Sequence, residues 1–164
     1  MKELLDKLSS YNIFNYLLPG IIFVAVSNYL SSYNFILEND FIGVFFYYFI
    51  GMVISRFGSL CIEPLLTEIK FLKFAEYKDF VEASSKDVKI ELLSEVNNSY
   101  RTIVALFVVL LLLKGYNYIA IFLEISDNIS ILIGVICVLV LFIFSYRKQT
   151  KYVYDRVQIN KNID

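Results

Sequence analysis

The residues whose types and spacing could support chemistry are five polar side chains at the ends of two apolar runs. Arg56 and Glu63 are seven residues apart, so they share one face of a helix. Glu95, Asn98 and Arg101 follow at intervals of three, which makes neighbours of successive members. If the two helices are antiparallel, Glu63 can pair with Arg101, and Arg56 with Glu95. We predict that these five residues form a boundary clamp, which is either a static polar contact or a ligand-responsive gate.

This set of residues is suited to ion pairing and not to catalysis. The chain contains no His, which excludes His-based acid–base catalysis and His ligation of metals. It has no Gly-rich phosphate loop and no nucleophile elbow. Cys61 and Cys137 lie inside apolar runs, where cysteine behaves as a small hydrophobic residue. We therefore predict a protein that is not an enzyme, with no catalytic residue, cofactor or metal site.

Four apolar runs must position the clamp. Hydrophobic residues make up 58% of the chain and charged residues 19%, a more apolar balance than in soluble proteins. About 20 apolar residues cross a hydrocarbon core of ~30 Å, and the third run reaches this length only if it continues past Lys114. We predict an all-α integral membrane protein of one domain, residues 1–164. Its expected transmembrane helices are residues 13–30, 41–62, 102–123 and 129–146.

The basic residues indicate how these helices are threaded. Fourteen of the fifteen Lys and Arg residues fall on one side of the four runs, and Lys114 is the exception. This is the positive-inside pattern of a protein with both termini in the cytoplasm. The net charge of −1 argues against a nucleic-acid partner. We expect a multi-pass membrane protein, with the lipid bilayer as its first partner.

The largest polar segment is residues 63–101, between the second and third runs. Its apolar residues have helical spacing, and Ser84 with Asp87 resembles a capping box that starts a new helix. We predict a cytosolic helical hairpin here, which could bind a cytosolic protein partner. Residues 147–164 form a polar cytosolic tail, as a short helix or frayed. Residues 1–9 form either an amphipathic helix on the inner leaflet or an extension of the first span.

Small and helix-distorting residues suggest how the helices pack. Gly51, Ser55 and Ser59 recur every four residues, a ridge that lets another helix approach closely. We expect this ridge to support a homo-oligomer, and the alternative is packing inside one subunit. In the first run, Pro19 removes a backbone donor and clashes with the carbonyl of the residue four positions earlier. A kink is therefore expected at Asn15, Pro19 and Gly20.

Four stretches of the chain form a recognisable set: YNIFNYLLPG at 11–20, GMVISRFGSLCIEP at 51–64, residues 94–101, and SYRKQT at 145–150. They resemble a group of small bacterial four-span membrane proteins, some of them encoded beside antiviral defence genes. The resemblance implies a component of the bacterial inner membrane that belongs to a defence or stress-response system, and it carries over no catalytic residue. The leading hypothesis is an effector that perturbs the membrane when a cytosolic partner acts on the hairpin. The alternatives are a constitutive small channel or carrier subunit and a scaffold that recruits a cytosolic enzyme.

Overall fold

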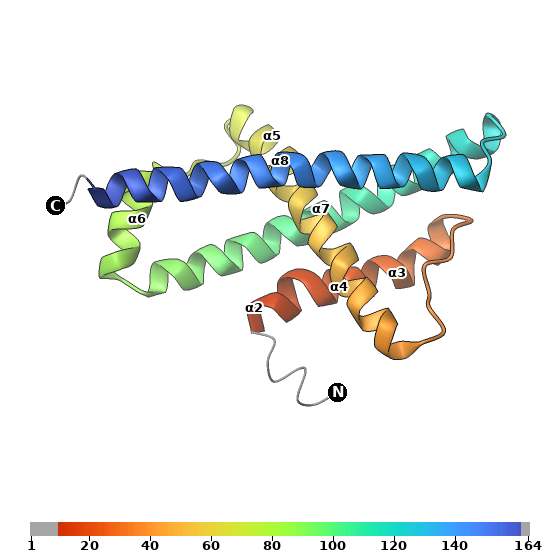
Figure 1. Ribbon diagram of the computed structural model, residues 1–164, viewed down its shortest axis with the longest axis horizontal. Coiled ribbons are helices and arrows are strands. Elements are labelled where there is room, and N and C mark those ends of the chain that lie inside the picture. Colours follow the sequence, from red (N-terminus) through yellow and green to blue (C-terminus); the bar gives the residue numbers. More distant parts are fainter. Residues whose placement is uncertain (1–9, 162–164) are drawn as a thin grey trace.

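The computed structural model describes residues 10–161, which form helices and their connections (Figure 1). Helix makes up 85% of the described residues, which include no strand, and this confirms the all-α prediction. The amphipathic helix predicted at residues 1–9 lies outside the described residues. The elements are α2 (Ser10–Asn12), η1 (Ile13–Leu17), α3 (Leu18–Leu30), α4 (Asp40–Phe57), η2 (Gly58–Ile62), α5 (Glu63–Glu68), α6 (Tyr77–Lys86), α7 (Lys89–Phe122) and α8 (Asp127–Lys161), with η1 and η2 being π-helical.

Four continuous helical runs are long and apolar enough to cross a membrane, as predicted. They are Ile13–Leu30, Asp40–Glu68, Lys89–Phe122 and Asp127–Lys161. The second run includes α4, η2 and α5. The third passes through Lys114 and Gly115 without interruption, which supplies the length that the stretch before Lys114 lacks.

The helix α4 is the centre of the packing. It packs against η1 and α3 along one side and against α7 and α8 along others, and Figure 1 shows it crossing the long pair α7 and α8 obliquely. The apolar core lies where α3, α4 and α7 meet. Its most deeply buried members are Ile54, Ala105 and Leu106, each at most 1% exposed.

Two glycines permit a close backbone contact between helices. A Cβ atom on Gly20 would lie 1.8 Å from the carbonyl oxygen of Tyr47, and one on Gly51 would lie 1.7 Å from that of Tyr16. Real Cβ atoms do not approach oxygen so closely, so the backbone of α4 touches that of α3 at Gly20 and that of η1 at Tyr16. Gly20, expected as part of a kink, therefore serves close packing.

Each of the two prolines follows a π-helical segment by two positions. η1 ends at Leu17 before Pro19, and η2 ends at Ile62 before Pro64. A proline ring clashes with the carbonyl four residues earlier, and a π turn widens the helix at that point. The distortion predicted at Pro19 is thus a wide turn in a continuous helical run. Pro64 does not end its helix, which continues to Glu68.

The segment predicted as a helical hairpin is divided more finely than expected. The helical spacing of residues 65–81 is interrupted at residues 69–76, where Lys70 adopts a positive φ of 61°. The next break is at Asp87, whose carboxylate accepts a hydrogen bond from the backbone N–H of Lys89 at 2.9 Å. Val88 is the residue immediately before α7, and the Asp87 carboxylate satisfies the first backbone N–H of that helix, whereas Ser84 remains inside α6.

The helices α7 and α8 extend well beyond the apolar runs that they contain. They have 34 and 35 residues, or about 51 and 52 Å at 1.5 Å per residue. The tail predicted as a short or frayed helix is the continuation of α8 to Lys161. α6 packs against both long helices near the N-terminus of α7 and the C-terminus of α8 (Figure 1), with Tyr77 and Tyr152 in ring contact at 5.3 Å. We call α6, residues 89–101 of α7 and residues 147–161 of α8 the stalk.

The opposite end of the molecule holds the connections at residues 31–39 and 123–126, neither of which carries a basic residue. The Tyr33 and Tyr116 rings stack at 6.3 Å, and both hydroxyls lie within 3.2 Å of the Ser130 hydroxyl. The backbone N–H of Ser32 donates to the Asn117 side chain at 3.1 Å. The connection between α3 and α4 is therefore bound to the ends of α7 and α8 that lie farthest from the stalk.

Candidate functional site

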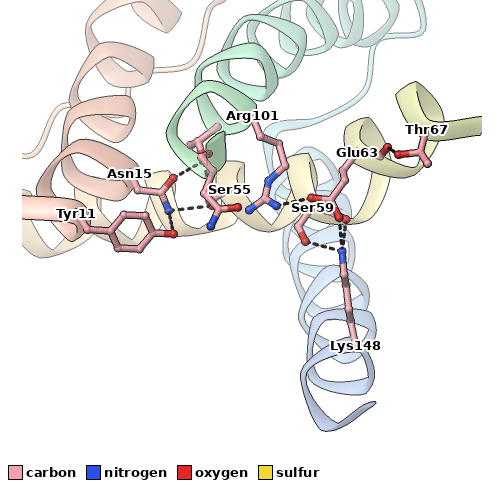
Figure 2. Close-up of polar contacts among 10 residues, drawn as sticks. Tyr11, Asn15, Ser55, Ser59, Glu63, Thr67, Arg101 and Lys148 are labelled. Atoms are coloured by element: carbon pink, nitrogen blue, oxygen red, sulfur yellow. Dashed lines mark hydrogen bonds and ion pairs between the residues drawn. The ribbon is translucent and has the colours of Figure 1, made fainter. Parts of the chain in front are cut away.

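Three polar side chains from three helices form an inner polar network of Asn15, Ser55 and Thr102. The Thr102 hydroxyl donates to Asn15 Oδ1 at 2.6 Å and lies 3.1 Å from the Ser55 hydroxyl. Asn15 Nδ2 donates to the Ser55 hydroxyl at 3.3 Å, a contact drawn in Figure 2. None of the three residues is more than 2% exposed. Because buried polar groups need partners, the network fixes the relative positions of η1, α4 and α7.

Tyr11 extends this network toward the N-terminal end of the first helix. Its hydroxyl accepts a hydrogen bond from Asn15 Nδ2 at 3.2 Å. Burial raises the pKa of the Tyr11 phenol, and the nearby Tyr16 acts in the same direction. The hydroxyl therefore stays neutral over the physiological pH range and keeps its hydrogen-bonding role.

A second group, the glutamate cluster, consists of Glu63, Arg101, Lys148 and Ser59 (Figure 2). One oxygen of Glu63 accepts from Arg101 Nη1 at 2.5 Å, and the other accepts from Lys148 Nζ at 3.0 Å. Lys148 Nζ also donates to the carbonyl and the hydroxyl of Ser59, at 2.8 and 2.9 Å. In the part of the chain that the structure describes, Glu63 is the one carboxylate that pairs with cations of other helices. It therefore connects the α4–η2–α5 run to both α7 and α8.

The local structure explains why Glu63 occupies this position. It is the first residue of α5 and follows the π-helical turn that precedes Pro64. Ser59 lies inside that turn, and Asn15 lies inside the other π-helical segment, so each π turn supplies one buried polar side chain. Both segments are thus associated with the polar contacts between helices.

The structure brings together part of the predicted boundary clamp. The predicted pairing of Glu63 with Arg101 is present. The pairing of Arg56 with Glu95 is wrong: Arg56 Nη2 donates to the Tyr16 hydroxyl at 3.4 Å, and Glu95 is exposed and makes no ion pair with a described residue. Asn98 is half-buried, and its carbonyl lies 2.9 Å from the Thr102 hydroxyl.

The small-residue ridge is occupied by helices of the same chain. Gly51 lies against the backbone of Tyr16, Ser55 belongs to the inner polar network, and Ser59 binds Lys148. All three are buried. The interpretation of this ridge as an interface between subunits is therefore wrong, and the alternative of packing inside one subunit is what the structure contains.

Two central residues were not predicted from the sequence. Lys148 follows Arg147 at the end of an apolar run, and both residues fit a simple stop signal equally well. Thr102 begins the third apolar run, where a threonine is unremarkable. A helical-face argument could have found Thr102, because it lies four residues after Asn98. No comparable signal separates Lys148 from Arg147.

The charges at this site do not balance among the described residues. Arg56, Arg101 and Lys148 carry three positive charges, and Glu63 carries the one negative charge paired with them. No three Cys, Asp or Glu side chains in residues 10–161 gather as metal ligands would. The contacts of the site join the α4–η2–α5 run to α7 and α8.

Comparison with known protein families, curated proteins and solved structures finds no match to this chain. The functional argument therefore depends on the geometry described above.

Proposed function

We propose that the protein spans the bacterial inner membrane four times, with both termini and residues 63–101 in the cytoplasm. The asymmetry of basic residues supports this threading. The lengths of α7 and α8 also support it, because each exceeds a ~30 Å hydrocarbon core by about 20 Å. The excess on both helices lies in the stalk, which would then project into the cytoplasm.

We further propose that the protein is a triggered membrane-perturbing effector of a defence or stress-response system, and not an enzyme. The observation that carries this proposal is the double pairing of Glu63 with Arg101 and Lys148. The two helices that Glu63 holds are also the two helices that build the stalk. A cytosolic partner that displaces the stalk therefore acts directly on the glutamate cluster, which serves as a latch.

The helix α8 is the element most easily released. Only 11% of its most apolar stretch is buried inside the described structure, whereas 39% of the first span is buried. Apart from Lys148, its contacts with α4 include a stacked pair of rings, Phe49 and Phe142, whose centroids are 6.0 Å apart. Opening of the latch would let α8 move away and would expose polar groups of the cluster to the bilayer, a costly state that favours water entry.

A scaffold that recruits a cytosolic enzyme is the second candidate function. Val88, Leu92 and Val96 are exposed and spaced four residues apart at the start of α7, so they form an apolar stripe on the stalk. Such a stripe fits a protein partner or a second copy of this chain, which would make a homo-oligomer. The scaffold requires only this surface, whereas the effector also requires the latch.

Cells that express latch variants can separate the two functions. We expect Glu63→Gln to depolarise the inner membrane on induction, because it frees Arg101 and Lys148 at the same time. The matched control is Glu95→Gln, which removes the same charge from an exposed residue that pairs with no cation in residues 10–161. Uptake of a potential-sensitive dye and the amount of folded protein in the membrane are measured together.

The outcomes differ clearly. Depolarisation by Glu63→Gln but not by Glu95→Gln supports the effector. Normal potential in both strains, with folded protein at wild-type level, contradicts it. The scaffold predicts this second result, together with loss of partner recruitment when α6 is deleted.

A further inference from the structure

A small cavity lies beside the glutamate cluster, between the α4–η2 run and α8. Its lining includes Arg56, Ser59, Ser145, Lys148 and Gln149. The recess has a volume of about 20 Å³ and is partly open, so it accommodates one water molecule or one oxygen atom of a larger group. The cavity is thus a polar recess with two cationic side chains in its wall.

Ser145 shows that this recess needs an occupant. The residue is 9% exposed, and its hydroxyl is buried with no hydrogen-bond partner in the described part of the chain. Buried hydroxyls are normally satisfied by protein, water or ligand. An oxygen atom placed in the recess would supply the missing partner.

The charges around the recess favour an anion over water. Lys148 shares Glu63 with Arg101, so the cluster has one more cation than carboxylate even before Arg56 is counted. The only side-chain partner of Arg56 among the described residues is the neutral Tyr16 hydroxyl, at 3.4 Å. Uncompensated cations near a membrane boundary are costly and attract anionic groups.

We propose that this recess binds the phosphate group of an anionic phospholipid, with one phosphate oxygen directed at Ser145. The residues lie where the apolar stretch of α8 gives way to Arg147 and Lys148, which is the depth expected of lipid phosphates. Basic recesses between spanning helices are known to bind such headgroups. This proposal rests on the proposed membrane threading and is independent of the effector function.

Native mass spectrometry of the full chain can count bound lipids. The purified protein is titrated with phosphatidylglycerol or with phosphatidylcholine, whose headgroup has no net charge. We expect at least one phosphatidylglycerol molecule to be retained in preference to phosphatidylcholine. Arg56→Gln should weaken this binding about tenfold, since it removes a charge-assisted hydrogen bond. The matched control, Arg147→Gln, removes an exposed charge at nearly the same depth and should change the affinity less than about threefold.

A second variant tests the recess without changing any charge. Ser145→Val fills the space and removes the hydroxyl, so it should weaken phosphatidylglycerol binding while thermal stability is retained. Equal losses for Arg56→Gln and Arg147→Gln would indicate only a diffuse basic surface and would overturn the proposal. Unchanged binding by Ser145→Val would overturn it as well. Competition by millimolar glycerol phosphate as effective as that by the lipid would show that the site takes a soluble phosphate instead.

Discussion

The substitution Glu63→Gln is the sharpest test of the latch. It keeps the size of the side chain but removes the charge that pairs with both Arg101 and Lys148. The Glu63 side chain is 19% exposed, so its partners cannot be fully solvated when it is lost. Removing one partner of a buried ion pair typically costs about 3–5 kcal/mol of unfolding free energy. We expect a loss in this range, because two cations are left instead of one.

The measurement is unfolding of the purified protein by SDS added to a mild detergent, followed by far-UV circular dichroism. Glu82→Gln is the matched control. Glu82 pairs with Lys86 at 2.7 Å within one exposed turn, and this hydrogen bond lowers the pKa of its carboxyl group. Exposed pairs contribute little to stability, so the control should unfold like the wild type.

A double-mutant cycle apportions the effect between the two cations. In a Lys148→Met background, Glu63→Gln should cost less by about 0.5–3 kcal/mol, the range for residues in direct contact. Equal losses for Glu63→Gln and Glu82→Gln, or a cycle without coupling, would refute the reasoning. Charge reversal at Glu63 with reversal at Arg101 should rescue stability only in part, because the new cation would lie beside Lys148.

Three further predictions follow from packing and threading. Gly51→Ala should strongly lower the free energy of unfolding in the same SDS titration, because its Cβ would overlap the Tyr16 carbonyl. The control Gly134→Ala has open space around it and should be neutral or stabilising by up to ~1 kcal/mol. Ser55→Leu should reduce thermal stability without changing the oligomer mass measured by light scattering. A lower mass would instead show that the small-residue ridge forms an interface between subunits. In cells, a cysteine at Ser85 should resist labelling by an impermeant thiol reagent from outside, whereas a cysteine at Asp127 should react; labelling of the Ser85→Cys variant alone would reverse the proposed threading.

Much of the fold could be predicted from the sequence because it depends on the length and composition of the apolar runs, which can be read along the chain. An apolar run of given length dictates a helix long enough to cross a membrane, since only internal hydrogen bonding satisfies its backbone in lipid. The pairing of Glu63 with Arg101 was also predictable. It needed only helical spacing and an antiparallel arrangement of neighbouring helices.

The tertiary structure decided which polar residues meet across helices. Arg147 and Lys148 are both basic and adjacent in the sequence. Only the rotation of α8 about its axis places Lys148, and not Arg147, beside Glu63. The same holds for Ser55, whose spacing with Gly51 fitted either a neighbouring subunit or this one. The rotation and crossing angle of each helix depend on many contacts between residues that are distant in the sequence, such as Gly51 and Tyr16. No local sequence pattern specifies these contacts together. The sequence by itself therefore determined the helices and their threading signal, and the packing of the folded chain determined the network that joins them.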